Sequence, residues 1–515
     1  MAAEKADLLL HEGVVAGHPE SDSVAVAGAR ILAHGRFVDL KKLVGPRTFL
    51  IRLAGSTVAP GFIDCHLHFM EGSSVAAGLS VERCRTIPDL LADLRTAAGR
   101  TPPGNWLRAF GCDEALMQER RGPTREELDL STSKNPLRLR HQTLHGSWLN
   151  SRAINLLGLE HPDFRSPEGA HMLREPDGRL SGLVIGMEEW LSARLPRVTA
   201  AELESRARTF SRELAAAGIT AFTDATVRNG AEDIRMFGQL AASGAIVQRV
   251  AVMVGPHAAA SASTLRRVAQ DAGVALAGVK FMSVDRWDVG RLVRAVAEAL
   301  SQELDCAFHC TEVEELEAAL TAIAAARERI SERAIAGTCC RIEHGGLIPP
   351  GYAERIAALE TWVVTNPGFI HYRGMKYAGD PGLIPFLYPA RTLAAAGVRL
   401  AAASDAPVTP ARPLVAIASA QSRISLEGYQ LGSEQQLDSP LAFALFTTSA
   451  AALSRVAAGV IAPGRLADLI VVPTNPFLAS AAELYRLAVD VTIVGGRVVY
   501  ERGRPTMTRG AASSS

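Results

Sequence analysis

Five short stretches of this sequence carry side chains that can bind a metal ion, and each lies in or at the end of an apolar run. They are residues 64–68, 278–281, 308–309, 343–344 and 404–405. Imidazole and carboxylate groups suit zinc and related divalent ions. One such stretch is weak evidence by itself. Because the five follow one another on alternating strand and helix patterns, together they predict a metal-dependent hydrolase site at the mouth of a barrel.

The first stretch contains His66 and His68, two positions apart in a predicted strand. Side chains at that spacing leave the same face of a strand, about 7 Å apart along the backbone. Two such imidazoles can converge on one cation, with metal–nitrogen bonds of about 2.0–2.1 Å. The alternative is a pair of histidines packed in the core.

His309, His344 and Asp405 each end a short run of apolar or small residues. Taken singly, each histidine is better explained as a hydrogen-bonded side chain near the core. The carboxylate of Asp405 needs a partner to remain charged after the largely apolar run 400–404, and a metal ion would supply one. All three residues fall at predicted carboxyl ends of strands, where barrel enzymes hold their catalytic groups.

Lys280 interrupts the apolar run 276–282. A lysine buried there with its charge unpaired would cost on the order of several kcal/mol. The side chain could instead reach solvent, pair with a carboxylate at the strand tip, or react with carbon dioxide to form a carbamate. A carbamate is anionic and has two oxygens, so it could bridge two cations.

The middle of the chain alternates between strand and helix patterns. Eight strand-like runs lie at residues 60–68, 218–224, 248–254, 277–283, 306–310, 341–345, 361–366 and 398–405. Most gaps between them show helical periodicity, for example 289–304 and 313–330. This pattern predicts a (β/α)8 TIM-like barrel, with an open doubly wound sheet as the alternative. No glycine-rich phosphate motif follows the first strand, which disfavours the open sheet.

Strand-like runs without intervening helices occur at both ends of the chain. We therefore expect residues 1–57 and 460–509 to form a small composite β-sandwich domain, and residues 58–459 to form the barrel. The gap 69–217 is too long for one helix and contains strand patterns of its own. We expect it to be an insertion after the first barrel strand that shapes the active face.

The composition favours an enzyme that acts on a small molecule. The chain has 515 residues, and its 54 basic side chains balance its 54 acidic ones. No net charge favours nucleic acid or an anionic membrane as a partner. No apolar run approaches the roughly 18 residues of a membrane helix, and the first residues lack a signal-peptide layout. We expect a cytoplasmic protein whose oligomeric state, monomer or homo-oligomer, stays open.

Several motifs resemble the signatures of the metal-dependent amidohydrolase superfamily. The opening motif is residues 58–68 (VAPGFIDCHLH), and the closing motifs are residues 404–408 (SDAPV) and 464–469 (GRLADL). Residues 144–151 (LHGSWLNS), 341–344 (RIEH) and 218–220 (GIT) are similar to amidohydrolase family 3, the YtcJ-like group. The resemblance extends over nearly the whole chain and implies a (β/α)8 barrel with a composite β-sandwich.

The resemblance also implies a ligand set. The matching positions are His66, His68, Lys280, His309, His344 and Asp405. The first two histidines and the aspartate would bind one metal ion, and the other two histidines a second. Lys280, as N6-carboxylysine, would bridge them, although the choice between one ion and two stays open. Zinc is the ion that these ligand types favour.

These groups together predict hydrolysis of a C–N bond in a small molecule: an amide, an N-formyl or N-acyl group, or a cyclic amide. The metal would generate hydroxide from water at neutral pH. Asp405 would accept the proton of that water and pass it to the departing amine. Deamination and ester hydrolysis are alternatives that keep the same site. A non-catalytic scaffold is the alternative outside the enzymes.

Four further residues are candidate substrate contacts. His145 and Trp148 lie on the insertion, whereas Asn366 and His371 follow the seventh strand. The alternative for the first pair is a structural role in capping the insertion, and the alternative for the second pair is a surface loop without function. The sequence departs from the family pattern at residues 143–144, 281–286 and 310–313. These positions flank the expected pocket, so the identity of the substrate stays open.

Overall fold

A computed structural model describes residues 5–143, 145–167, 169–196, 198–503 and 507–509. The chain folds into two compact units. Met70–Phe210 form one unit, and the segments on either side of them in the sequence form the other. The predicted long insertion after the first barrel strand is therefore confirmed.

Eight parallel strands form the central sheet of the larger unit. In spatial order they are β7 (Phe62–Leu67), β14 (Ile219–Asp224), β15 (Arg249–Val254), β16 (Ala275–Phe281), β17 (Cys306–Cys310), β18 (Cys340–His344), β19 (Trp362–Thr365) and β20 (Leu400–Ala402). Backbone hydrogen bonds just beyond β20 join the two outer strands, from Asp405 N to His66 O (2.9 Å) and from His68 N to Ala406 O (2.8 Å). The sheet therefore closes into the predicted (β/α)8 barrel.

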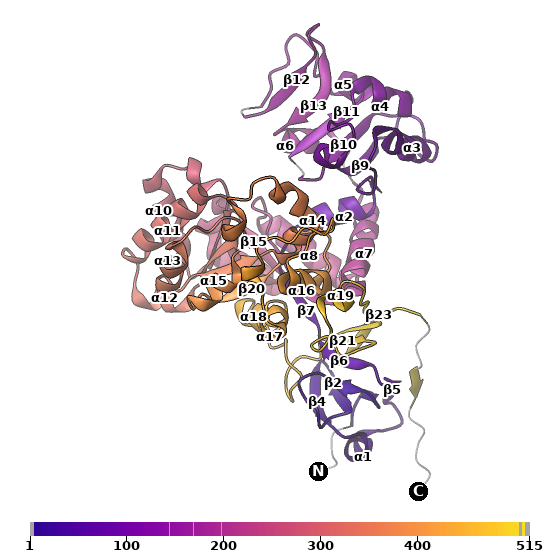
Figure 1. Ribbon diagram of the computed structural model, residues 1–515, viewed down its shortest axis with the longest axis vertical. Helices are drawn as coiled ribbons and strands as arrows, with labels where there is room; N and C mark the ends of the chain where they lie inside the picture. The colour runs from indigo at the N-terminus through magenta and orange to yellow at the C-terminus, as the bar shows by residue number, and fades with distance from the viewer. Residues whose placement is uncertain (1–4, 144, 168, 197, 504–506, 510–515) are drawn as a thin grey trace. The chain divides into compact units, whose positions relative to one another are not determined.

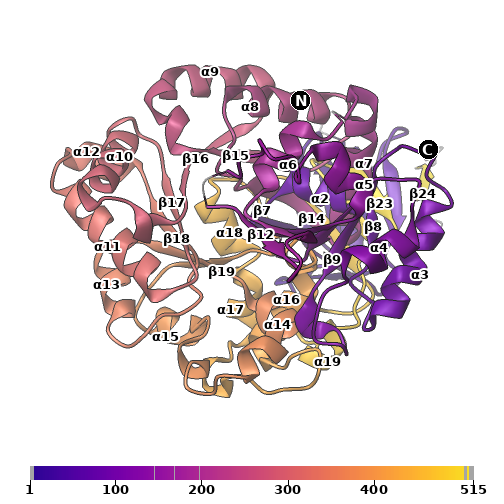
Figure 2. The same cartoon turned by 90° about the horizontal axis from the view of Figure 1, so that it is seen from above.

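The barrel strands are largely buried on both faces because helices cover their outer side. The helices that follow the barrel strands along the chain are α8 (Ala231–Ala242), α9 (Ala262–Ala272), α10 (Val289–Ser301), α11 (Val313–Arg327), α13 (Tyr352–Ala358), α14 (Pro367–Ala378), α15 (Ala390–Ala395), α16 (Pro413–Ser422), α17 (Ser439–Ala444) and α18 (Thr448–Leu453). Figure 2 shows α8, α9, α10, α11 and α13 outside strands β15 to β18.

Helix α10 illustrates why these segments become helices. Leu292, Val296 and Leu300 recur every four residues and are buried, which places them on one face of the helix. Asp288 caps the helix start, since its side chain accepts a hydrogen bond from Arg291 N (2.8 Å). The buried stripe fixes the helix against the barrel and thereby fixes the ends of the adjoining strands.

Strands from both ends of the chain form two five-stranded sheets (Figure 1). One sheet contains β1 (Leu8–His11), β3 (Ser23–Ala27), β4 (Arg30–Gly35), β5 (Phe49–Arg52) and β24 (Met507–Arg509). The other contains β2 (Val14–Val15), β6 (Thr57–Pro60), β21 (Leu469–Val472), β22 (Val491–Val494) and β23 (Arg497–Glu501). Buried residues of both sheets, including Leu10, Val24, Leu469 and Ile493, share one core. The predicted composite β-sandwich is thus confirmed.

The smaller unit has its own six-stranded sheet, in the order β12-β13-β11-β10-β9-β8. The strands are β8 (Leu79–Ser80), β9 (Leu107–Cys112), β10 (Leu137–His141), β11 (Gly146–Leu149), β12 (His171–Arg174) and β13 (Leu180–Ile185). Its helices are α3 (Ile87–Ala98), α4 (Arg125–Ser131), α5 (Ser151–Leu157) and α6 (Glu188–Arg194). Helices α2 (Phe69–Ala76) and α7 (Ala200–Ala216) lead into and out of this unit along the chain. Among the described helices, none is both long enough and apolar enough to cross a bilayer.

Candidate metal centre

Three of the predicted ligands converge where the barrel closes. Nε2 of His66 lies 3.5 Å and Nε2 of His68 lies 3.2 Å from Oδ1 of Asp405. One ligand atom from each residue falls within 4.8 Å of the others. Strand β7 supplies both histidines, and the loop after β20 supplies the aspartate. Two imidazole nitrogens and one carboxylate oxygen that face each other are a suitable donor set for a divalent ion.

The other two histidines lie next to this group. Nε2 of His344 is 3.1 Å from Nδ1 of His309, and the ring of His344 is centred 5.0 Å from that of His66. His309 comes from β17 and His344 from β18. These five candidate ligands therefore gather at the carboxyl ends of four barrel strands, and Lys280 is the sixth.

Two of the candidate ligands have a strained backbone. His344 has φ +68° and Asp405 has φ +59°, in the left-handed region that non-glycine residues rarely adopt. Strict strand alternation would place the side chains of Glu343 and His344 on opposite faces of β18. The left-handed turn at His344 lets both point into the barrel. Strain of this kind concentrates at functional sites, because the surrounding structure must maintain it.

Hydrogen bonds to Nδ1 orient three of the imidazoles. Nδ1 of His66 contacts the carboxylate of Glu343, Nδ1 of His68 lies 3.0 Å from the Thr226 hydroxyl, and Nδ1 of His344 lies 2.8 Å from Oδ1 of Asn366. A carboxylate can only accept, so His66 must donate from Nδ1. The unprotonated Nε2 of His66 then faces Oδ1 of Asp405 at 3.5 Å, the orientation that a metal ligand at this position would need.

Burial determines the charge of the candidate ligands. It lowers the pKa of His66, His309 and His344 below the ordinary value, which favours the neutral imidazoles that bind metal ions. Burial alone would raise the pKa of Asp405. Contact with His68 is the largest of the effects that outweigh burial and hold that pKa well below its usual range. Asp405 is therefore a carboxylate.

Lys280, on β16, is 1% exposed. Its Nζ and Oδ1 of Asp405 are buried atoms without a hydrogen-bond partner in the described part of the chain. Burial lowers the pKa of Lys280 to about 8, although Glu343 and Asp405 partly oppose this effect. The amine is thus partly neutral near pH 8, and the neutral form is the one that reacts with carbon dioxide. Two unsatisfied polar atoms and a set of facing donors show that these residues fit a metal ion.

The predicted substrate contacts lie in different places. Asn366 is 1% exposed and contacts His344, while its Nδ2 donates to Ala403 O (3.0 Å). Asn366 therefore orients the ring of His344, one of the candidate ligands, and substrate binding by Asn366 stays a prediction. His371 stacks on Tyr485, with ring centroids 4.5 Å apart, and its Nδ1 lies 3.2 Å from Ile424 O.

His145 and Trp148 belong to the smaller unit. His145 is exposed, whereas Trp148 is 4% exposed and packs in the hydrophobic core of that unit. The burial of Trp148 is typical of a packing residue. Substrate binding by either residue stays a prediction.

Three further residues contact the site and are not among those predicted from the sequence as ligands or substrate contacts: Glu343, Arg341 and Thr226. Arg341 and Glu343 are charged residues two positions apart on β18. Both are buried, with exposed fractions of 4% and 0%. Such a pair on one strand face is a signal of a buried ion pair. Thr226 follows β14 and has no comparable signal in the sequence.

A second group of donors lies in the smaller unit. Asp113, Glu114 and His141 bring ligand atoms within 4.8 Å of one another. All three are partly exposed, and Asp113 already accepts a hydrogen bond from Ala115 N (3.0 Å). His141 lies 3.1 Å from the Glu114 carboxylate. This group is explained as a surface ion pair beside a capped turn.

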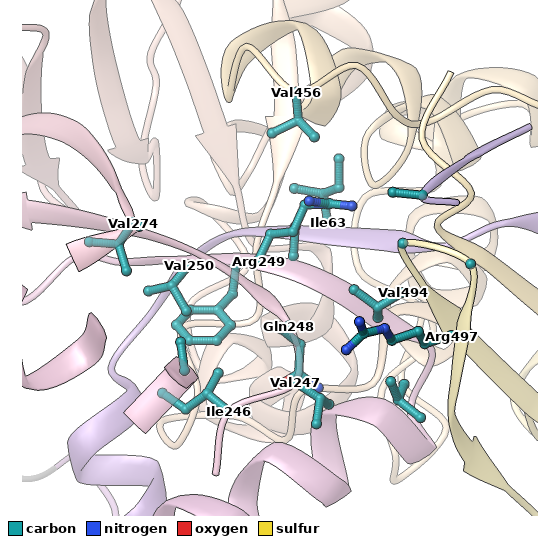
Figure 3. Close-up of a pocket in the computed structure, with 18 of the residues that line it drawn as sticks. Ile63, Ile246, Val247, Gln248, Arg249, Val250, Val274, Val456, Val494 and Arg497 are labelled. Atoms are coloured by element: carbon teal, nitrogen blue, oxygen red, sulfur yellow. The ribbon is translucent and has the colours of Figure 1, made fainter. Parts of the chain in front are cut away.

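The cavity in Figure 3 lies at the other end of the barrel. Its volume is about 1140 Å³, and its lining includes Gln248 and Arg249 at the start of β15 and Val274 before β16. Val494 and Arg497 of the terminal strands also line it. The candidate ligands lie at the carboxyl ends of the strands, so this cavity is separate from the metal centre.

Comparisons with known proteins agree with this geometry. The sequence profile of the Amidohydrolase family matches residues 50–500. An N-substituted formamide deformylase from Arthrobacter pascens is 26% identical, and the alignment covers 94% of this chain and 95% of that protein. The putative amidohydrolase YtcJ of Bacillus subtilis strain 168 is 24% identical, with 94% and 96% covered.

Among solved structures, an uncharacterized metal-dependent hydrolase from Pyrococcus horikoshii has a TM-score of 0.70 at 20% identity. The alignment covers 92% of this chain and 99% of that one. A similar hydrolase from Pyrococcus furiosus has a TM-score of 0.68, also at 20% identity. At this level of identity the similarity shows a shared fold. The family match extends over most of the chain, and this protein therefore belongs to the amidohydrolase family, as an enzyme that hydrolyses C–N bonds.

Proposed function

We propose that this protein is a metal-dependent hydrolase that cleaves the C–N bond of a small N-acylated amine, with N-substituted formamides as the first substrates to test. The observation that carries the proposal is the convergence of His66, His68 and Asp405 beside His309 and His344. The nearly full-length similarity to an N-substituted formamide deformylase supports the choice of substrate class.

The residues divide into two metal-binding groups. His66, His68 and Asp405 would hold one divalent ion, and zinc is the ion that imidazole and carboxylate ligands favour. His309 and His344 would hold a second ion, and Lys280, once carboxylated, would bridge the two. When bound, such ions polarise the scissile carbonyl and acidify water.

Asp405 would move the proton. Its carboxylate is held in the ionised form by the surrounding imidazoles, so it can accept a proton from the attacking water. It would then donate that proton to the nitrogen of the departing amine. Each cleaved C–N bond consumes one water molecule, whose hydroxyl group goes to the carbonyl carbon and whose remaining hydrogen goes to the nitrogen. A formamide would therefore give formate and an amine in equal amounts.

A panel of three substrate types tests this proposal. The zinc-reconstituted enzyme is incubated with an N-aryl formamide, the formate ester of the matching alcohol, and an aromatic amine, and the products are followed by proton NMR. Formate and amine from the formamide are the expected products. Reaction of the ester alone, or release of ammonia without a carboxylic product, would replace the proposal with esterase or deaminase activity. Fully metal-loaded protein without any turnover would favour a scaffold.

A further inference from the structure

A buried ion pair lies inside the barrel, in contact with the candidate metal centre. Glu343 is 0% exposed and Arg341 is 4% exposed. One carboxylate oxygen of Glu343 contacts Nε of Arg341, and the other contacts Nδ1 of His66. The pair belongs to β18, whereas His66 belongs to β7. One carboxylate therefore connects two strands that are not neighbours in the sheet.

Arg341 reaches the same strand as His66. Its Nη2 donates to the carbonyl oxygen of Cys65 at 2.9 Å. The ion pair thus contacts two consecutive residues of β7, the backbone of Cys65 and the ring of His66. This arrangement constrains both the position of the strand and the rotation of the imidazole.

We propose that Glu343, held by Arg341, is the positioning residue that fixes His66 for metal binding. This inference rests on the proposed metal-dependent function. Since a carboxylate only accepts hydrogen bonds, Glu343 requires the proton of His66 to be on Nδ1 and leaves the Nε2 lone pair directed at Asp405. Arg341 supplies the countercharge that a fully buried carboxylate needs.

A purely structural ion pair would behave differently. Its loss would lower the fraction of folded protein, but the protein that remains folded would bind metal with unchanged affinity. The positioning role instead predicts that the metal affinity of folded protein changes when the carboxylate is neutralised. Partners that orient ligating histidines typically contribute about 10- to 100-fold to metal affinity.

The test compares Glu343→Gln with Glu317→Gln. Glu317 forms an Arg–Glu pair with Arg355, at 2.6 and 3.1 Å, on the helical surface of the same unit. Each change neutralises one carboxylate of such a pair without altering its size. Zinc affinity is measured by competition with a chromogenic chelator. We expect Glu343→Gln to bind zinc about 10- to 100-fold more weakly, and Glu317→Gln to bind it like the parent.

Glu343→Gln leaves Arg341 unpaired and could fail to fold, so two further measurements accompany it. The double variant Arg341→Met with Glu343→Gln removes both buried charges, and we expect it to fold with the same weakened zinc binding. In the metal-free parent, labelled with ¹⁵N-histidine, we expect a slowly exchanging Nδ1–H signal that His66→Asn removes.

The outcomes separate this inference from the proposed function. Zinc affinity of the folded variants within twofold of the parent, or protonation of His66 at Nε2 in the parent, would overturn the positioning role. A parent that binds zinc, with weakened binding in the variants, supports the positioning role even where no C–N bond is cleaved. In that case the proposed substrate class alone would fail.

Discussion

At the scale of single residues, Asp405 would connect metal binding to proton transfer. Its Oδ1 faces the Nε2 atoms of His66 and His68 and accepts no hydrogen bond from the described residues. Asp405→Asn keeps the shape but removes the charge and the ability to accept a proton. We expect kcat to fall by about 10²- to 10⁴-fold, measured at matched zinc content. An unchanged kcat in that variant would contradict the proton-transfer role.

Lys280 gives a second prediction at this scale. The Lys280→Ala variant should lose activity, because no bridging carbamate can form. Short carboxylic acids such as propionate should partly restore it, since their two oxygens can occupy the vacated space. The hydrolysis rate of the variant is measured as a function of carboxylate concentration. The same variant without added acid gives the baseline. Full activity without any added acid would exclude the bridging role.

At the scale of elements, the strand ends were predictable and the links between strands were not. A histidine lies at or next to the carboxyl end of β7, β17 and β18, and Asp405 follows β20. The strand periodicity therefore predicted that these residues lie at one end of the barrel. The contact between Glu343 and His66 spans 277 positions in the sequence. Such pairings depend on the barrel's closure, which brings distant strands together. The hydrogen bond between Asn366 and His344 likewise depends on how the ends of the neighbouring strands β18 and β19 lie next to each other.

An ion pair between two helices outside the barrel predicts how the stability of the protein depends on pH. Glu317 of α11 pairs with Arg355 of α13, and this hydrogen bond lowers the pKa of Glu317 to about 2. A carboxyl group whose pKa is depressed by folding stabilises the protein above its unfolded pKa, near 4.5, and loses that contribution as the pH falls towards 2. The pair is half-exposed, so its contribution is at most about 1 kcal/mol.

We therefore expect Glu317→Gln to reduce the free energy of unfolding at pH 7, with a difference from the parent that shrinks below pH 4.5. Urea denaturation at pH 7, 5 and 4 measures this trend. A difference that grows as the pH falls would contradict the assigned pKa.

At the scale of the whole molecule, Asp468 links the barrel to the terminal sheets. This residue of the closing motif is 2% exposed. It accepts two hydrogen bonds from Arg249, at 2.7 and 3.1 Å, and a third from Gly495 N at 2.7 Å. Because Arg249 begins β15, at the end of the barrel away from the candidate ligands, we assign this motif residue to stability.

Asp468→Asn should lower the free energy of unfolding by about 1–3 kcal/mol while kcat of the folded enzyme stays unchanged. Asp490→Asn is the matched control, since Asp490 pairs with Arg502 at the surface and its loss should be nearly neutral. If the Asp468→Asn variant is fully folded but has a lower kcat than the parent, this residue belongs to the catalytic machinery instead.

The dependence of C–N cleavage on metal content tests the central claim most directly. Purified protein is stripped with a chelator, titrated with zinc in the presence of bicarbonate, and assayed for formate and amine released from an N-substituted formamide. We predict no activity in the stripped protein and activity that rises with bound zinc to a plateau at one or two ions per chain, with both products in equal amounts. Full activity in protein shown to be metal-free would contradict a metal-dependent site built from His66, His68 and Asp405.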